Sequence, residues 1–342
     1  GGEGATGSRG RAALACWTAS ACCRAAVPAL MDRPMDMPMD GAVRSAAGRA
    51  SPLPDEPKSG LGILKCGVCC VADGPDERPI APTAPSMWFT LPPDLQMEPE
   101  GRPEGLTDLG MVALEGGAAY AGQWLGEQRH GHGVIMRSDG GRFEGQFRED
   151  CCHGQGRFVH ANGDVYDGQW TMDKAHGRGK FLHADGSMYD GEWQQDLKVG
   201  TGYEVWCDGS NFKGDYVNGK KHGFGLFTSA DNSSYAGQFV EDNMDGEGTY
   251  SFADGRVYTG QWKESQMSGN GQMRWPDGRH FVGSYVQDRK SGEGKFTWPD
   301  GRIYSGAWLN GKQHGAGVFV DAKGRDRRGE WDNGHRMRWA DA

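Results

Sequence analysis

Three cysteines close together are the first residues of this sequence that could do chemistry. They stand in the string CGVCC, as Cys66, Cys69 and Cys70. A Cys-x-x-Cys pair offers two thiolates at a spacing that zinc sites use, but no second Cys or His pair follows at the spacing of a zinc finger. Three interpretations therefore stay open: ordinary thiols, a weak metal site, or S-acylation that tethers the segment to a membrane.

Five histidines are the second candidates for metal binding. They stand at multiples of one fixed spacing, as His130, His153, His176, His222 and His314. Copies that lie one repeat apart would be separated by about 10 Å, whereas each ligand of a zinc ion lies about 2 Å from the metal. The spacing favours a framework role, and we expect neither a metal nor another cofactor.

No arrangement typical of an enzyme accompanies these residues. There is no Ser/His/Asp constellation, no phosphate-binding loop and no dinucleotide fingerprint, and strings that look like Gly-x-Gly-x-x-Gly are products of an internal repeat. The net charge of −9, with a pI near 5.6, argues against a nucleic-acid binder that works through its overall field. We therefore expect a protein that is not an enzyme and has no nucleic-acid partner.

A modest concentration of basic residues lies at the C-terminal end. Anionic lipid headgroups are a natural partner for such a patch. The candidate lipid-contact residues are Arg325, Arg327, Arg328, Arg336 and Arg338.

A repeat of 23 residues organises the chain from residue 120. Nine units begin with an aromatic residue, at Tyr120, Phe143, Tyr166, Tyr189, Phe212, Tyr235, Tyr258, Phe281 and Tyr304, and Arg327 begins a partial tenth. A glycine follows two residues later and an aromatic residue four residues later in all ten units. Five units carry the full triplet Tyr-x-Gly-x-Trp, and these framework triplets are Tyr120, Gly122 and Trp124; Tyr166, Gly168 and Trp170; Tyr189, Gly191 and Trp193; Tyr258, Gly260 and Trp262; and Tyr304, Gly306 and Trp308. Each full unit continues with Gly-x-Gly and closes on Asp-Gly or a near relative.

The physics of this unit predicts a β-hairpin. Tyr-x-Gly-x-Trp alternates with period two, so rings and glycine share one strand face while polar residues such as Asp167 and Gln169 meet water. Glycines on the ring face leave room for neighbouring rings, and Asp-Gly is a strong turn signal. One hairpin is marginal, but stacked copies bury a continuous aromatic row. The sequence thus predicts an all-β fold, an elongated single-layer antiparallel β-hairpin array about 90–100 Å long.

Proline marks the domain boundary. Of the 16 prolines, 14 lie in residues 1–118, which are rich in Ala, Gly and Pro and have few apolar clusters. We predict a low-complexity, largely disordered leader over 1–118 and the repeat array over 119–342. Residues 1–30 fit low-complexity or mistranslated upstream sequence better than a transit peptide, because they have no clear cleavage pattern.

The unit resembles the MORN (membrane occupation and recognition nexus) repeat, which reads approximately Tyr-Glu-Gly-Glu-Trp…Gly-Lys-x-His-Gly-x-Gly…Asp-Gly. YDGQWTMDKAHGRGKFLHADG (166–186) and YSGAWLNGKQHGAGVFVDAKG (304–324) match it closely, and the resemblance covers about 120–342. The histidine of the motif is replaced by Val199, Asp245, Ser268 and Ser291, and two units depart further. Glu204 stands where other units place an apolar side chain, so a local irregularity is expected there in preference to a partner contact. The tenth unit lacks Gly-x-Gly, as a terminal cap would.

The resemblance implies a non-enzymatic scaffold or adaptor. Its aromatic, polar-edged groove would dock another protein at a cytoskeletal, ciliary or membrane-proximal assembly of the cytoplasm. The alternative that it implies is a phosphoinositide- or membrane-binding module that contacts acidic phospholipid, such as the regulatory region of a phosphatidylinositol-phosphate-kinase-like protein without its catalytic domain. An exposed last strand also offers an edge for homo-oligomers through a terminal repeat.

Overall fold

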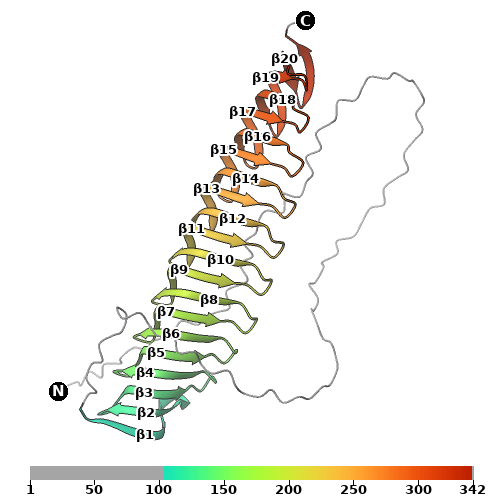
Figure 1. The fold of residues 1–342 in the computed structure, drawn as a ribbon. Helices are drawn as coiled ribbons and strands as arrows, with labels where there is room; N and C mark the ends of the chain where they lie inside the picture. Colours follow the sequence, from blue (N-terminus) through green and yellow to red (C-terminus); the bar gives the residue numbers. More distant parts are fainter. Residues whose placement is uncertain (1–103, 341–342) are drawn as a thin grey trace, which may run out of the picture. The chain divides into compact units, whose positions relative to one another are not determined.

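The computed structural model describes residues 104–340, and these form one antiparallel sheet of 21 strands (Figure 1). Every strand pairs with the strands next to it in sequence, so the chain is one continuous meander. The elements are β1 (Leu106–Ala113), the 3-10 turn η3 (Glu115–Gly117), β2 (Ala119–Leu125), β3 (Gln128–Met136), β4 (Arg142–Arg148), β5 (Cys151–Val159), β6 (Val165–Thr171), β7 (Lys174–Leu182), β8 (Met188–Gln194), β9 (Leu197–Val205), β10 (Asn211–Val217), β11 (Lys220–Thr228), β12 (Ser234–Val240), β13 (Asn243–Ser251), β14 (Val257–Lys263), β15 (Gln266–Arg274), β16 (His280–Val286), β17 (Arg289–Thr297), β18 (Ile303–Leu309), β19 (Lys312–Val320), β20 (Asp326–Asp332) and β21 (His335–Trp339). The predicted all-β, single-layer antiparallel hairpin array is confirmed.

The sheet begins before the predicted boundary at residue 119. Strand β1 lies within the segment assigned to the leader and pairs with β2, with Leu109 opposite Gly122 and Ala113 opposite Ala119. Its sequence, LTDLGMVA, has neither the ring nor the Gly-x-Gly of a full unit, so the repeat pattern gave no sign of it. The leader assignment is corrected here, since β1 covers an edge of β2 that would otherwise be open. The earlier part of the leader, with Cys66, Cys69 and Cys70, lies outside the described residues.

The hairpins use two kinds of turn. The predicted Asp-Gly turns lie between units: at the first, the Gly140 N–H donates to the Arg137 carbonyl (3.1 Å) and Gly140 has a φ of 92°. The turns inside the units are two-residue loops with positive φ at both positions, as at Glu149 and Asp150 (51° and 68°). This is the geometry of a type I′ turn. It recurs at Met172–Asp173, Gln195–Asp196, Asn218–Gly219, Glu241–Asp242, Glu264–Ser265, Gln287–Asp288, Asn310–Gly311 and Asn333–Gly334.

The two glycines of Gly-x-Gly have different physical roles. The second glycine pairs with the framework glycine across the hairpin, as Gly133 does with Gly122, and it lies on the ring face as predicted. The first glycine, Gly131, has a φ of 67° and lies where the register of β2 and β3 shifts. It therefore forms a bulge, a conformation that a residue with a Cβ rarely adopts. The paired glycines lie on the ring face as predicted, whereas the bulge formed by the first glycine of Gly-x-Gly was not predicted.

The framework glycines make room for a neighbouring ring, as the sequence predicts, and also for the facing strand. A Cβ at Gly168 would lie 2.7 Å from the Arg178 carbonyl oxygen and 2.9 Å from the hydroxyl oxygen of Tyr166. A Cβ at Gly306 would lie 2.6 Å from the Ala316 carbonyl oxygen. The prediction for Gly168 and Gly306 is therefore confirmed for the first ring of their own unit, and the close approach of the facing strand is a second reason for glycine that the sequence did not predict.

We expect the paired glycines to be intolerant of a single added methyl group. A Cβ at Gly294 would lie 2.5 Å from Cζ of Phe281. Gly294→Ala should lower the free energy of unfolding by about 1–3 kcal/mol, because the ring cannot move out of a packed row. Gly110→Ala is the control, since a Cβ there meets nothing within 4 Å. Denaturant unfolding compares the two variants, and equal effects would contradict the assigned role.

Candidate binding surface

The aromatic row is the core of the protein. The Tyr120 ring makes edge-to-face contacts with Trp124 of its own unit (5.2 Å between centroids) and with Phe147 of the next unit (5.0 Å). The tyrosines of the five framework triplets are each at most 2 % exposed, and the tryptophans of the same triplets are each at most 9 % exposed. The expectation that this row forms an open docking groove is therefore wrong, because the rings cover one another.

Four of the five framework tryptophans, all but Trp124, also bind the unit before them through their indole groups. The Trp170 indole N–H donates to the Gly156 carbonyl, and the Trp193 indole N–H donates to the Gly179 carbonyl, each at 2.9 Å. Both acceptors are second glycines of a Gly-x-Gly. Trp170 and Trp193 are thus core residues that tie consecutive units together, which corrects the expectation that such rings line a groove. The sequence pattern showed which face these rings share but not this hydrogen bond.

The tyrosine hydroxyls are also engaged within the fold. The Tyr120 hydroxyl donates to the carbonyl of Gln123 at 2.9 Å, and the Tyr304 hydroxyl donates to that of Ala307 at 3.0 Å. Burial raises the pKa of both phenols to about 12. These groups are neutral hydrogen-bond donors at physiological pH and contribute no charge for a ligand.

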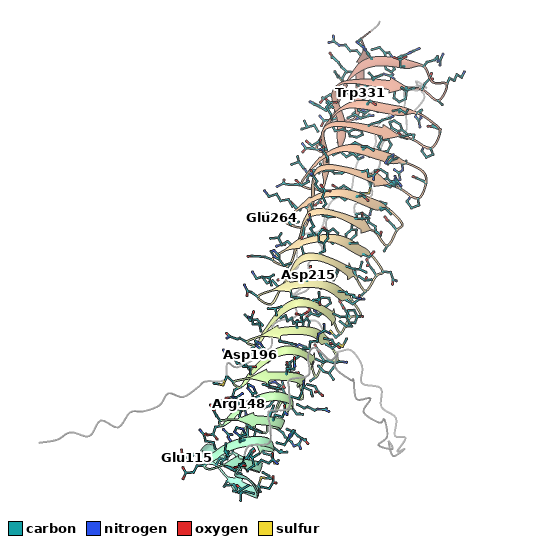
Figure 2. All side chains as sticks on the ribbon, turned by 60° about the vertical axis from the view of Figure 1, so that its left-hand side comes forward. Glu115, Arg148, Asp196, Asp215, Glu264 and Trp331 are labelled. Carbon is teal, nitrogen blue, oxygen red and sulfur yellow. The ribbon has the colours of Figure 1, made fainter. Side chains whose placement is uncertain are left out.

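The two-residue turns lock each unit to the unit before it. The Asp196 N–H donates to the Ala175 carbonyl (3.0 Å), and the Ala175 N–H donates to the Asp196 carboxylate (2.8 Å). Burial raises the pKa of Asp196. Two hydrogen bonds of about 1 kcal/mol each offset the cost of positive φ at residues other than glycine. Figure 2 shows Arg148, Asp196 and Glu264, from or beside three such turns, along one edge of the array.

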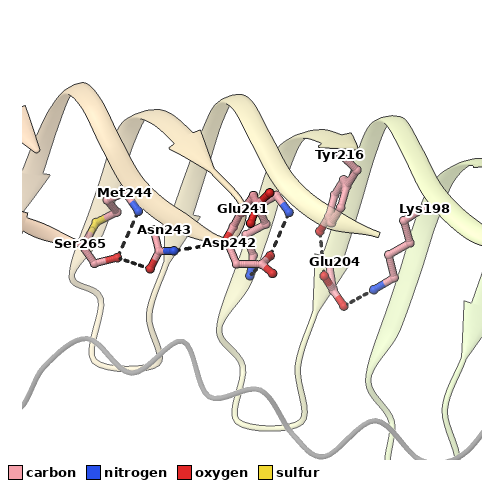
Figure 3. Close-up of polar contacts among 9 residues, drawn as sticks. Lys198, Glu204, Tyr216, Glu241, Asp242, Asn243, Met244 and Ser265 are labelled. Atoms are coloured by element: carbon pink, nitrogen blue, oxygen red, sulfur yellow. Dashed lines mark hydrogen bonds and ion pairs between the residues drawn. The ribbon is translucent and has the colours of Figure 1, made fainter. Parts of the chain in front are cut away.

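Unit four contains a partly buried polar cluster around Glu204, which stands where most other units place a ring. Glu204 accepts hydrogen bonds from Lys198 (2.5 Å) and from the Tyr216 hydroxyl (2.7 Å) (Figure 3). Burial and the Glu204 carboxylate raise the pKa of Tyr216. Strands β8 and β9 keep the same pairing offset as the other hairpins, with Gly191 opposite Gly202. The local irregularity that we expected in unit four is therefore absent from this strand pairing. Unit four differs from the other units in the side chains of this cluster and not in the register of its strands.

One ring-facing position per unit varies widely in chemistry. It lies opposite the second framework ring and is occupied by Arg129, Cys152, Ala175, Lys198, Lys221, Met244, Met267, Lys290 and Gln313. Lys290 is the most buried cation among them, with 2 % of its surface exposed.

Four rings surround the Lys290 ammonium group. Its Nζ lies 4.9 Å from the ring centres of Phe296 and Trp308 and 5.3 Å from those of Trp275 and Phe281. Burial lowers the pKa of Lys290 to about 8. The ring faces oppose that shift, because they attract the cation. Lys290 is thus a charge held inside the core.

Two of the candidate lipid-contact arginines are paired with carboxylates. Arg325 lies 2.6 Å from the Asp321 carboxylate, and Arg338 lies 2.9 Å from that of Glu330. The pKa of Asp321 falls to about 2 because Arg325 donates hydrogen bonds to its carboxylate. Both ion pairs are exposed to solvent, so they are weak, but each arginine already has an anionic partner.

Two further arginines close the end of the aromatic row. The guanidinium carbons of Arg327 and Arg336 lie 5.5 and 4.4 Å from the centre of the Trp339 ring. The centre of the Trp339 ring in turn lies 6.2 Å from that of Trp331, the second ring of the last unit. Arg328 is exposed on the opposite face. The lipid contact of these five arginines remains a prediction, but four of them already contact a carboxylate or the Trp339 ring.

The histidines lie on the second strands of their hairpins, each just before the bulge glycine. His314 contacts the Asp332 carboxylate through Nδ1 at 3.3 Å. Within residues 104–340 no group of three or more His, Cys, Asp or Glu side chains is arranged to hold a metal ion.

The sheet face opposite the rings, here called the polar face, carries a shallow groove. Two adjoining depressions of about 560 and 620 Å³ lie over β11–β16 and share Glu247 and Thr259 in their linings. Paired glycines such as Gly260 and Gly271 form the floor. This polar-face groove escaped the sequence analysis, because the positions that line it do not follow the repeat pattern.

Comparison with known protein families finds one match to the repeat array. The MORN repeat family matches residues 120–142, 143–165, 166–188, 189–211, 212–234, 235–255, 258–278, 281–301 and 304–324, together more than half of the chain. These nine matches begin at the residues that the repeat pattern predicts. Comparison with curated proteins finds no match.

Solved structures give distant similarity only. The TCP10 domain of Danio rerio CPAP, in complex with a STIL peptide, is 13 % identical with a TM-score of 0.37, and the match covers 67 % of this chain and 97 % of that one. The SAS-4 (dCPAP) TCP domain of Drosophila melanogaster, in complex with a proline-rich motif of Ana2, is 12 % identical with a TM-score of 0.29, and the match covers 52 % and 90 %. Scores this low carry no argument about partners. Residues 104–340 also contain no helix of the length and apolar character that spanning a bilayer requires.

Replacing Lys290, whose ammonium group is surrounded by four rings, should stabilise the protein. Met244 and Met267 hold the same position in earlier units, so Lys290→Met fits the space. We expect a gain of about 1–3 kcal/mol at pH 7, because the buried ammonium is removed. The folded pKa lies below the ordinary value of 10.5, so the penalty of the lysine is full below about pH 8 and fades towards pH 10.5.

The test of Lys290→Met is the stability difference between variant and parent, measured by denaturant unfolding at pH 7 and pH 9.5. The difference should shrink at the higher pH. Lys312→Met, at an exposed site, controls for loss of one charge. A destabilised variant, or a difference that does not vary with pH, would show that the rings compensate the buried charge fully.

The unit-four cluster should tolerate complete replacement but not partial removal. Glu204→Leu leaves Lys198 and the buried Tyr216 hydroxyl unpaired, at a cost of about 1–3 kcal/mol. The triple variant Lys198→Met, Glu204→Phe, Tyr216→Phe carries side chains that other units hold at these positions, and we expect it to match the parent in thermal midpoint or exceed it. A triple variant less stable than Glu204→Leu would refute this account.

Proposed function

The chain belongs to the MORN repeat family, and from this premise we propose that it is a non-enzymatic scaffold that binds another protein along its sheet. The observation that carries the proposal is the division of the sheet into two faces. The rings of one face are buried against one another, while the opposite face presents varied side chains on an unbroken backbone. Such a surface holds partners at fixed places along its length.

The proposed setting is the cytoplasm, at a cytoskeletal, ciliary or membrane-proximal assembly. Support for it comes from the family alone, since MORN arrays are associated with membrane and cytoskeletal contexts. Self-association through a terminal repeat also remains a proposal. In the described sheet β1 and β21 each pair on one side only, and unpaired strand edges are the groups that extend a sheet.

The second candidate is a module that binds acidic phospholipid through the basic C-terminal end. The five arginines motivate it, as does the name of the family. What counts against it is the engagement of four of them, all but Arg328, with Asp321, Glu330 and Trp339. A lipid headgroup would have to compete with partners already at contact distance.

The scaffold proposal predicts a stable protein partner on the polar face. Full-length chain purified from cells should retain at least one protein, and lysine crosslinks to that protein should form at Lys180, Lys213 and Lys295, which are exposed on this face. Vesicle flotation with and without phosphatidylinositol phosphates runs in parallel. A chain that retains no protein but floats with acidic vesicles in a salt-sensitive manner would overturn the proposal in favour of the lipid module.

A further inference from the structure

The polar face changes its chemistry halfway along the array. Two positions per strand flank the paired glycine on this face, and over β4–β10 they are mostly charged. The charged side chains are Glu144, Arg157, Asp167, Arg178, Lys180, Asp190, Glu192, Lys213 and Asp215. Opposite charges stand at directly paired positions, as with Glu144 and Arg157 or Arg178 and Glu192. Charges of opposite sign therefore face one another across strands in this half.

The half over β11–β16 is almost free of charge. The same positions hold Phe224, Leu226, Ala236, Gln238, Glu247, Thr249, Thr259, Gln261, Asn270, Gln272, Val282 and Ser284. Glu247 is the single charged residue among them. Strand β17 then restores charge with Glu293 and Lys295. The uncharged stretch therefore coincides with the polar-face groove.

The apolar side chains at the groove are exposed in the protein as it stands. Phe224 is 64 % exposed, and Leu226 and Val282 are each 46 % exposed. Phe224 lines the depression that also contains Ala236 and Glu247. An exposed aromatic ring next to an aliphatic side chain is a usual anchor for a partner.

Amide groups supply hydrogen-bond donors between these anchors. The Gln238 side-chain oxygen accepts from the Glu247 N–H (2.8 Å), and the Gln261 oxygen accepts from the Asn270 N–H (2.8 Å). With their oxygens engaged, both amides offer their NH₂ groups. Such donors suit the carbonyl groups of an extended backbone.

The size of the groove fits a peptide and excludes the face of a second copy. Six strands at about 4.8 Å spacing give a length of roughly 25–30 Å, and four residues of width give about 13 Å. The product, on the order of 400 Å², is about half of what each partner contributes to a stable protein–protein interface. It matches about eight residues of extended chain.

We propose that the polar-face groove over β11–β16 binds an extended segment of another protein that is uncharged except for one lysine or arginine. The basic side chain meets Glu247, and an apolar side chain about three residues away packs against Phe224 and Leu226, since two strand spacings separate β11 from β13. This proposal rests on the scaffold function and names the chemistry of its partner.

The test is a random 12-residue peptide library selected on the full-length chain. Enriched sequences should contain one basic residue, no acidic residue, and an apolar residue about three positions from the basic one. A synthetic enriched peptide should lose about threefold to fivefold in affinity for Glu247→Gln and at least about fivefold for Phe224→Ser. Glu247→Lys should select acidic peptides instead.

Glu293→Gln is the matched control, because Glu293 occupies the same column of the polar face just beyond the groove. It should leave the affinity unchanged. The assignment would be overturned if the library yielded no enriched sequence or if the parent chain enriched acidic sequences. It would also be overturned if the enriched peptide bound Glu247→Gln and Phe224→Ser as tightly as it binds the parent chain. Crosslinks of the cellular partner at Lys180 or Lys213 would in that case still uphold the scaffold function, so the two proposals fail separately.

Discussion

The packing of an aromatic ring over a pair of glycines is the constraint on which the rest of the structure depends. In each of the nine full units the first ring lies over the two facing glycines, and a Cβ at either one would collide with the ring or with the backbone opposite, as at Gly283 and Gly294. The ring can sit this close only because both side chains are absent. Each ring then contacts the second ring of its own unit and that of the next, as Phe281 does with Tyr285 and Trp308. A single layer thereby acquires a continuous core.

That core gives the two faces of the sheet different roles, packing on the ring face and binding on the polar face. Rings with almost no exposed surface leave no aromatic groove, so the variable side chains of the polar face are the ones available to a partner. The two-residue turns add a second ladder, in which residues such as Asp196 bind the preceding unit. Polar residues at ring-facing positions find partners close by. Glu204 pairs with Lys198 in unit four, and the Lys290 ammonium lies among four rings.

The repeat period predicted the fold and the framework residues because a strict constraint acts at every twenty-third position. The type I′ turns were not predicted, because residues such as Glu149 and Asp150 are poor signals of positive φ and depend on hydrogen bonds to the previous unit. Strand β1 was not predicted because its sequence lacks the repeat pattern, and it forms a strand through its pairing with β2. The polar-face groove follows no period, since it arises where charges are absent from consecutive strands. Only cross-strand register reveals such a stretch.

Hydroxyl-radical footprinting of the full-length chain, read residue by residue by mass spectrometry, tests the central claim most directly. The account predicts that Tyr258, Trp262 and Tyr304 are protected in the free protein, whereas Phe224 and Leu226 react. Reactivity of the framework rings equal to that of Phe224 would contradict it, because the aromatic row would then be an open surface and not the core.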